Sequence, residues 1–246
     1  MDKELSIPEA FSHGYLMFKK HGTALFPSLG FFGFVIIFFG IIIKGTEVSA
    51  PLASHLFNAA GTIIELVLML GLIHMVFALE KDEKISFKDL FAVRHLFFRY
   101  FFAIIFLVIA FGVLCIIPAF LLIYYADTHG HLFFPFTIGV AILAVGVFFM
   151  TRLKLMAYVI VAENKKTIAA LKRSWQLTKG NSVTFFAFVL LAGIFNLVGA
   201  ALFLIGLLVT VPITLFGMVY VYKQLAHNAD ELSQHEKKDQ STISIA

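Results

Sequence analysis

Two polar side chains interrupt long apolar stretches of the sequence. Glu65 lies in the apolar run 59–79, roughly 9 Å from its outer end, and Asn196 lies at a comparable depth in the run 183–222. A carboxylate inside a membrane costs a few kcal/mol, so it usually faces other helices. We expect Glu65 and Asn196 to meet, either in a structural hydrogen bond between helices or in a site for a proton or a small-molecule substrate.

A basic segment between two apolar runs also carries side chains suited to binding. As a helix from Thr167, it could lie on an anionic leaflet with Trp175 at the headgroup boundary. Gly180 and Asn181 would end this helix, because glycine adopts the left-handed conformation that turns the chain into the next span. Four residues at steps of three or four would form its apolar face: Ile168, Leu171, Trp175 and Thr178.

Six side chains in and before this segment have the charge or the ring expected of contacts with anionic lipid headgroups. Two of the basic ones follow the fourth apolar run and mark where its helix would leave the membrane. A solvated surface charge is the alternative interpretation for the basic residues. The candidate headgroup contacts are Arg152, Lys154, Lys172, Arg173, Trp175 and Lys179.

No other residues have the spacing of a catalytic or metal site. The chain has no Ser/His/Asp or Cys/His set, no glycine-rich phosphate loop and no H-x-x-x-H or C-x-x-C pair. Asp127, His129 and His131 alternate on a short connection, where a polar turn is the simpler interpretation. The single cysteine, Cys115, excludes an internal disulfide. We therefore expect no enzyme activity, no metal and no cofactor.

The composition is that of a membrane protein. Of the 246 residues, 60% are hydrophobic and only 14% are charged, against about 25% charged residues in an average soluble domain. The apolar runs provide six spans of about 20 residues each. The small excess of 19 Lys and Arg over 15 Asp and Glu does not suggest nucleic-acid binding. We predict one polytopic membrane domain, residues 1–228, and a polar, disordered cytoplasmic tail, residues 229–246.

The positions of the basic residues predict the orientation. Lys44 is the only Lys or Arg in the first, third and fifth connections between spans. The N-terminus, the second and fourth connections and the tail carry the other 18 of the 19. By the positive-inside rule, both termini are cytoplasmic.

Similar segments recur at a spacing of 80 residues. Ser6 and Glu9, which have the spacing of a helix N-cap pair, are matched by Ser86 and Asp89. We predict an all-α membrane fold of six transmembrane helices in three hairpins, each preceded by a cytoplasmic amphipathic interfacial helix. The corresponding pseudo-repeats are residues 6–85, 86–165 and 166–228.

One stretch also resembles a known family. From Arg152 the chain reads RLKLMAYVIVAENKKTIAALKRSWQLTKGN. It is similar to the signature of the uncharacterised bacterial YciC-like six-span inner-membrane proteins, which are related to the membrane domain of some glycerophosphodiester phosphodiesterases. The resemblance implies a six-span fold in the bacterial inner membrane, and the catalytic domain of the fused phosphodiesterases has no counterpart here. The matching residues are Glu163, Ala170, Leu171, Ser174, Trp175, Leu177, Gly180 and Asn181.

The sequence favours a non-enzymatic function. The basic amphipathic segments predict a component of the envelope or of membrane homeostasis whose partners are membrane lipids. The alternative is a small transporter or channel with an intramembrane site near Glu65 and Asn196. That alternative predicts a cavity between the second and fifth spans.

Overall fold

The computed structural model describes residues 5–129, 133–202 and 206–243. These residues form helices and connections, without a strand. The helices are α1 (Ile7–Thr46), α2 (Pro51–Leu79), the short 3₁₀ helices η1 (Phe87–Phe91) and η2 (Arg94–Leu96), α3 (Phe97–His129), α4 (Phe133–Leu153), α5 (Met156–Glu163), α6 (Thr167–Leu177), α7 (Ser182–Ala201) and α8 (Leu207–Ile243).

Six helical stretches of the described chain are long and apolar enough to cross a membrane. This confirms the prediction of an all-α, multi-pass membrane protein. The stretches are Ile7–Thr46, Pro51–Leu79, Phe87–Val113, Thr137–Glu163, Ser182–Ala201 and Leu207–Glu231.

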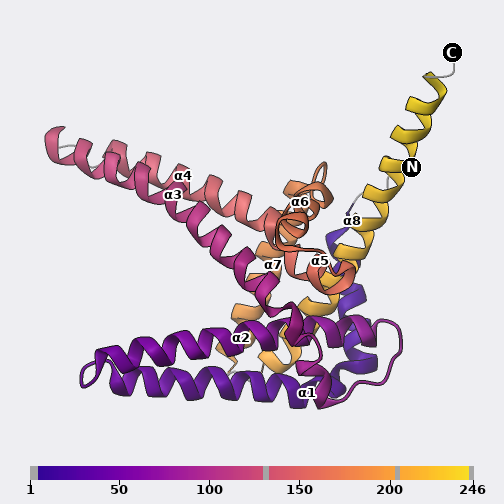
Figure 1. Cartoon of the computed structure of the whole chain (residues 1–246), viewed down its shortest axis with the longest axis horizontal. Coiled ribbons are helices and arrows are strands. Elements are labelled where there is room, and N and C mark those ends of the chain that lie inside the picture. Colours follow the sequence, from indigo (N-terminus) through magenta and orange to yellow (C-terminus); the bar gives the residue numbers. More distant parts are fainter. Residues whose placement is uncertain (1–4, 130–132, 203–205, 244–246) are drawn as a thin grey trace.

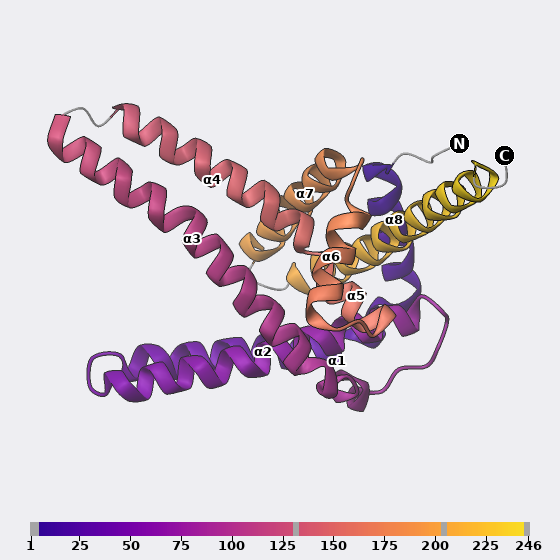
Figure 2. The same cartoon turned by 45° about the horizontal axis from the view of Figure 1, so that its top comes forward.

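The long helices pair as the hairpins α1–α2, α3–α4 and α7–α8. The α1–α2 and α3–α4 hairpins diverge from a common centre, with the two chain termini on the opposite side (Figure 1). The same centre holds the short helices α5 and α6 (Figure 2). Here α8 packs along the first part of α1, and this contact joins the first hairpin to the last.

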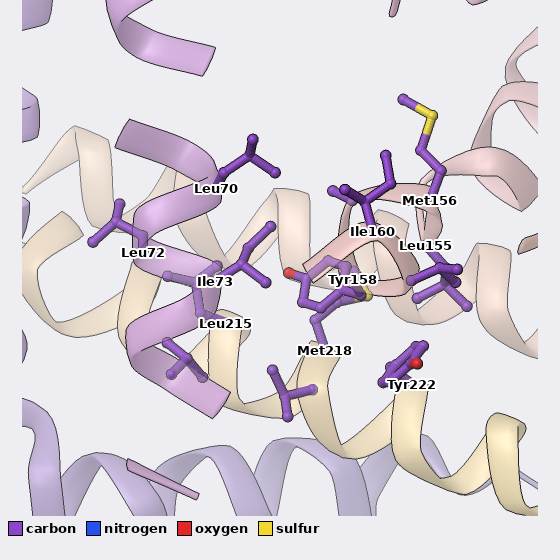
Figure 3. Close-up of a cluster of buried hydrophobic side chains, with 14 of the residues drawn as sticks. Leu70, Leu72, Ile73, Leu155, Met156, Tyr158, Ile160, Leu215, Met218 and Tyr222 are labelled. Carbon is purple, nitrogen blue, oxygen red and sulfur yellow. The ribbon is translucent and has the colours of Figure 1, made fainter. Parts of the chain in front are cut away.

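The core of the protein lies between α2, α5 and α8 (Figure 3). Residues 155–160 are all buried, so the start of α5 is covered on every side, as expected of a helix that is apolar all round. The ring of Tyr222 lies 5.6 Å from that of Phe77 and 6.3 Å from that of Tyr158, measured between centroids. Aromatic side chains from three helices therefore close the core.

Close helix contacts depend on glycines at two crossings. A Cβ atom on Gly14 of α1 would lie 2.3 Å from the carbonyl oxygen of Ile213 in α8, and one on Gly71 of α2 would lie 1.9 Å from that of Leu90 in η1. Both distances are far below van der Waals contact, so a larger residue would push the backbones apart. The apolar run 183–222 is divided into two helices, because α7 ends at Ala201 and α8 starts at Leu207.

The three predicted interfacial helices adopt three different conformations. The first is not separate: Ser6 Oγ accepts a hydrogen bond from Glu9 N, as the N-cap pattern predicts, but α1 then runs on for 40 residues through the first span. Gly22, which follows Lys19, Lys20 and His21, has the pattern of a helix end, but it is buried inside the continuous helix.

The second segment is not an α-helix. Ser86 and Asp89 do form a capping box, with Ser86 N donating to Asp89 Oδ2 over 2.6 Å, but the residues that follow form η1 and η2. Phe87 stacks edge-on against Phe31 of α1 while Leu90 is fully buried. Packing against the α1–α2 hairpin, and not helical periodicity, determines this backbone. Of the three segments, only the third forms a separate α-helix, α6.

The tail also differs from its prediction. The structure continues α8 through the tail to Ile243, where the sequence predicts disorder. No Gly or Pro occurs after Pro212 except Gly217, and residues 229–238 are rich in helix-favouring Ala, Glu, Leu, Gln and Lys. A side-chain contact one turn apart, His227 to Glu231 at 3.1 Å, supports the helix where it leaves the core.

Candidate functional site

The C-terminal ends of α4 and α6 are joined by reciprocal hydrogen bonds. Ser174 Oγ donates to the carbonyl oxygen of Arg152 over 2.8 Å. In return, the Arg152 guanidinium donates to the carbonyl oxygen of Trp175 over 3.0 Å and to Thr178 Oγ1 over 3.1 Å. Helix ends carry carbonyl groups without an intrahelical partner, and these bonds satisfy them. Arg152 is therefore a structural bridge as well as a candidate headgroup contact.

Trp175 is held by the same bridge. The Arg152 guanidinium lies 3.7 Å from the centroid of its indole, and the Phe149 ring stacks on it at 5.5 Å with an interplanar angle of 4°. A cation over an indole face is stabilised by about 0.5–2 kcal/mol. Trp175 is nevertheless 37% exposed, so part of its ring faces outward.

We expect Arg152→Gln to change the fluorescence of Trp175, the single tryptophan of the chain. The substitution removes the charge over the indole and the hydrogen bonds to the end of α6, so the emission maximum should shift and the melting temperature should fall by the equivalent of about 1–2 kcal/mol. Emission spectra and thermal melts in detergent measure both effects. Arg152→Lys keeps the charge but loses the planar donor, so its emission maximum and melting temperature should lie between those of the wild-type protein and Arg152→Gln. An unchanged spectrum in Arg152→Gln would contradict the bridge.

The predicted apolar face of α6 is only partly buried in the protein. Leu171 and Thr178 of that face are buried, whereas Ile168 and Trp175 are exposed. The buried residues of the helix itself are Ala170, Leu171, Ser174 and Leu177. The small side chains of Ala170 and Ser174 let α6 approach its neighbours closely. Their side of the helix therefore packs against the core, and the bulkier Ile168 and Trp175 stay outside. Four of the eight residues that resemble the YciC-like signature, Ala170, Leu171, Ser174 and Leu177, are thus internal packing residues.

The exposed face of α6 combines apolar and basic residues. Four of them recur at steps of three or four positions, so they lie on one stripe. We call these four residues the outer stripe of α6: Ile168, Lys172, Trp175 and, in the turn that follows, Lys179.

Arg173 is not part of this stripe. Its guanidinium pairs with Asp230 over 2.6 Å and with Glu163 over 3.4 Å, and its side chain is only 16% exposed. Burial opposes its charge, but the hydrogen bond to Asp230 and the attraction of Glu163 outweigh burial and raise the pKa of Arg173 above its ordinary value. Because Tyr222 also donates to Glu163 over 2.8 Å, Arg173 joins α5, α6 and α8.

Gly180 ends the third segment as the sequence predicts. Its φ is +86°, in the left-handed region, and α7 starts two residues later at Ser182. The hydroxyl of Ser182 donates to the carbonyl oxygen of Thr178 over 2.7 Å across the turn. This turn directs the chain from α6 into the fifth span.

Glu65 and Asn196 are not hydrogen-bonded to each other. Asn196 Nδ2 donates to Thr214 Oγ1 over 3.1 Å, and the Thr214 hydroxyl donates to the carbonyl oxygen of Val211. Glu65 is half-buried on α2 and has no hydrogen bond or ion pair among the described residues. The predicted pairing is therefore wrong: the two residues share a depth, but Asn196 faces α8.

Lys154 and Asn196, however, line one cavity. Its volume is about 750 Å³, and its walls come from α1, α2, α7, α8 and the break between α4 and α5. Asn196 Oδ1, at the cavity wall, is buried and accepts no hydrogen bond from any described residue. The cavity lies between the second and fifth spans, where the transporter alternative expects one, but Glu65 is not in its lining. The sequence indicates Lys154 and Asn196 as separate candidates, but it does not predict that they line the same cavity.

The break that positions Lys154 is a single turn of irregular backbone. Lys154 N donates to the carbonyl oxygen of Thr151, three residues back, and α5 restarts at Met156. Non-helical backbone at membrane depth occurs where it is covered by protein or lines a cavity, and here it does both.

The described residues contain no group of three or more His, Cys, Asp or Glu placed to hold a metal ion. The side chains of Asp127, His129 and His131 lie outside the described ones.

No family model matches the chain, and no curated protein or solved structure is significantly similar to it.

Proposed function

We propose that this integral membrane protein is a non-enzymatic, lipid-interacting component of the bacterial inner membrane, with both termini in the cytoplasm. The outer stripe of α6 carries the proposal. Ala170, Leu171, Ser174 and Leu177 attach α6 to the core, which leaves the outer stripe exposed, although Trp175 also stacks on Phe149. Exposed Ile168 and Trp175 beside Lys172 and Lys179 have the chemistry of contact with anionic headgroups.

The alternative of a transporter with a site at Glu65 and Asn196 has less support. The two residues are not bonded to each other, and only Asn196 lines the cavity. The cavity lining is mostly apolar, which suits a lipid better than a hydrophilic solute.

We expect the double variant Lys172→Gln, Lys179→Gln to lose the preference of Trp175 for anionic lipid. The protein is reconstituted into vesicles in which either phosphatidylglycerol or phosphatidylcholine carries brominated chains, which quench a nearby tryptophan. Brominated phosphatidylglycerol should quench the wild-type protein more strongly. Each lysine near the surface contributes about 1 kcal/mol, so removing both should lower the local enrichment roughly tenfold or more.

The matched control is Lys81→Gln, Lys84→Gln, which removes the same charge from an exposed connection outside α6. This control should quench as the wild-type protein does. Equal loss of preference in both double variants would indicate a general charge effect and contradict the proposal, as would an undiminished preference in the α6 variant.

A further inference from the structure

The cavity described above contains one unpaired charge. Lys154 is the only charged residue among the described residues that line it, and no described carboxylate lies within ion-pair distance of its ammonium. The other polar lining residues are Tyr158, Asn196 and Thr214, which are neutral. A lysine within a membrane span costs about 2.5–3.5 kcal/mol unless it finds a partner or water.

The helix ends at Lys154 do not supply that partner. The C-terminus of α4, at Leu153, favours a cation, but the N-terminus of α5, at Met156, disfavours one by a similar amount. Neighbouring Arg152 uses its guanidinium on the end of α6. Lys154 has no corresponding bond, and it is exposed to the cavity.

The rest of the cavity suits a hydrocarbon chain. A Cβ atom added at Gly30, Gly33 or Gly193 would meet nothing within 4 Å, so open space lies beside all three glycines. The surrounding side chains are aliphatic or aromatic, and Phe34 and Ile37 in the lining remain 60% and 51% exposed. The hollow is therefore open to the outside at these residues of α1, where acyl chains could enter from the bilayer.

We infer that this cavity is a binding site for one anionic phospholipid, with the phosphate paired to Lys154 and an acyl chain beside Gly30, Gly33 and Gly193. The volume of about 750 Å³ lies within the range of about 300–1,000 Å³ typical of small-molecule sites. It accommodates a headgroup and part of the chains, and the remaining chain length extends through the opening. Charge complementarity selects an anionic lipid over a zwitterionic one, because the ammonium has no other counter-charge.

Native mass spectrometry of the full chain tests this inference. The protein is extracted in mild detergent from vesicles of equal amounts of phosphatidylglycerol and phosphatidylcholine. The wild-type protein should retain one phosphatidylglycerol under conditions that remove all other lipid. Lys154→Met should weaken this retention tenfold or more, since one charge-assisted contact is lost, and Lys154→Arg should keep it.

Filling the cavity is the second arm. Gly193→Leu should abolish retention, because its Cβ would meet nothing within 4 Å and the rest of its side chain would extend into the cavity. Gly40→Leu is the matched control: its Cβ also meets nothing within 4 Å, but Gly40 does not line the cavity, so the lipid should stay. Thermal melting of all variants verifies that they are folded.

Several outcomes would overturn the inference. They are retention of phosphatidylglycerol by Lys154→Met at the wild-type level, equal retention of phosphatidylcholine, a fatty acid as the retained mass, or an unchanged Gly193→Leu. The Lys172→Gln, Lys179→Gln variant should keep the bound lipid, since neither lysine lines the cavity. Failure of this inference is thus distinguishable from failure of the proposed role of α6.

Discussion

Gly71→Leu should prevent most of the protein from reaching its folded state, and Gly71→Ala should lower its melting temperature. The reason is the contact of α2 with η1, where an added Cβ would lie 1.9 Å from the carbonyl oxygen and 2.6 Å from the carbonyl carbon of Leu90. These are backbone atoms, so no side-chain rotation relieves the clash. Leu90 is fully buried, and moving η1 away would uncover it.

Two opposing effects set the size of the change at Gly71. Overpacking a core costs about 1–3 kcal/mol and occasionally more, whereas alanine gains about 1 kcal/mol over glycine within a helix. Because the clash is with backbone atoms, we expect the cost of overpacking to exceed the helix preference. Gly71→Ala should therefore destabilise the protein by about 2 kcal/mol, and Gly71→Leu by far more. The yield of monodisperse protein and the melting temperature in detergent measure the result.

The comparison for Gly71 is Gly40→Ala in α1. Its added Cβ would meet nothing within 4 Å, so only the helix preference acts, and the melting temperature should stay the same or rise. A Gly71→Ala protein as stable as Gly40→Ala would show that η1 yields easily, and would contradict the role given to this glycine.

The features that could be predicted from the sequence depend on local chemistry. The spans follow from apolar length, the N-cap at Ser6 from residue type and spacing, and the end of the third segment from Gly180, which has the expected positive φ. In each case a few neighbouring residues determine the conformation, whatever packs against them.

Features that depend on distant contacts were not predictable in the same way. Glu65 and Asn196 lie at similar depths, but depth does not say which helices are neighbours, and Asn196 bonds to Thr214 of α8. The side of α6 that packs against the core does not follow from apolarity alone, because close packing favours the small residues Ala170 and Ser174. Lys154 meets the same cavity as Asn196 only through the break after α4 and the arrangement of α1, α7 and α8.

Glu80 is a further residue whose importance only the structure shows. It follows the last residue of α2, and its side chain is only 5% exposed. His13 of α1 lies 2.7 Å from its carboxylate, and Lys223 of α8 donates to the carboxylate over 2.8 Å. Side chains from α1, the end of α2 and α8 therefore meet at one carboxylate.

We expect Glu80→Gln to destabilise the protein by about 2 kcal/mol. Removing one partner of a buried ion pair costs about 3–5 kcal/mol, but Lys223 is 44% exposed and can regain water, which lowers the cost. An acidic group at a helix C-terminus is itself unfavourable by about 0.3–1 kcal/mol, and the substitution relieves this. The ion-pair loss is the larger of the two, so the melting temperature should fall.

A double-mutant cycle with Lys223→Met separates these effects on Glu80. If the two side chains stabilise each other, the double variant should be less destabilised than the sum of the single variants. Glu83→Gln, an exposed carboxylate on the following connection, is the matched control and should melt as the wild-type protein does. A higher melting temperature in Glu80→Gln would mean that the helix-end repulsion outweighs the ion pair, and that α1, α2 and α8 are held at this point by apolar packing alone.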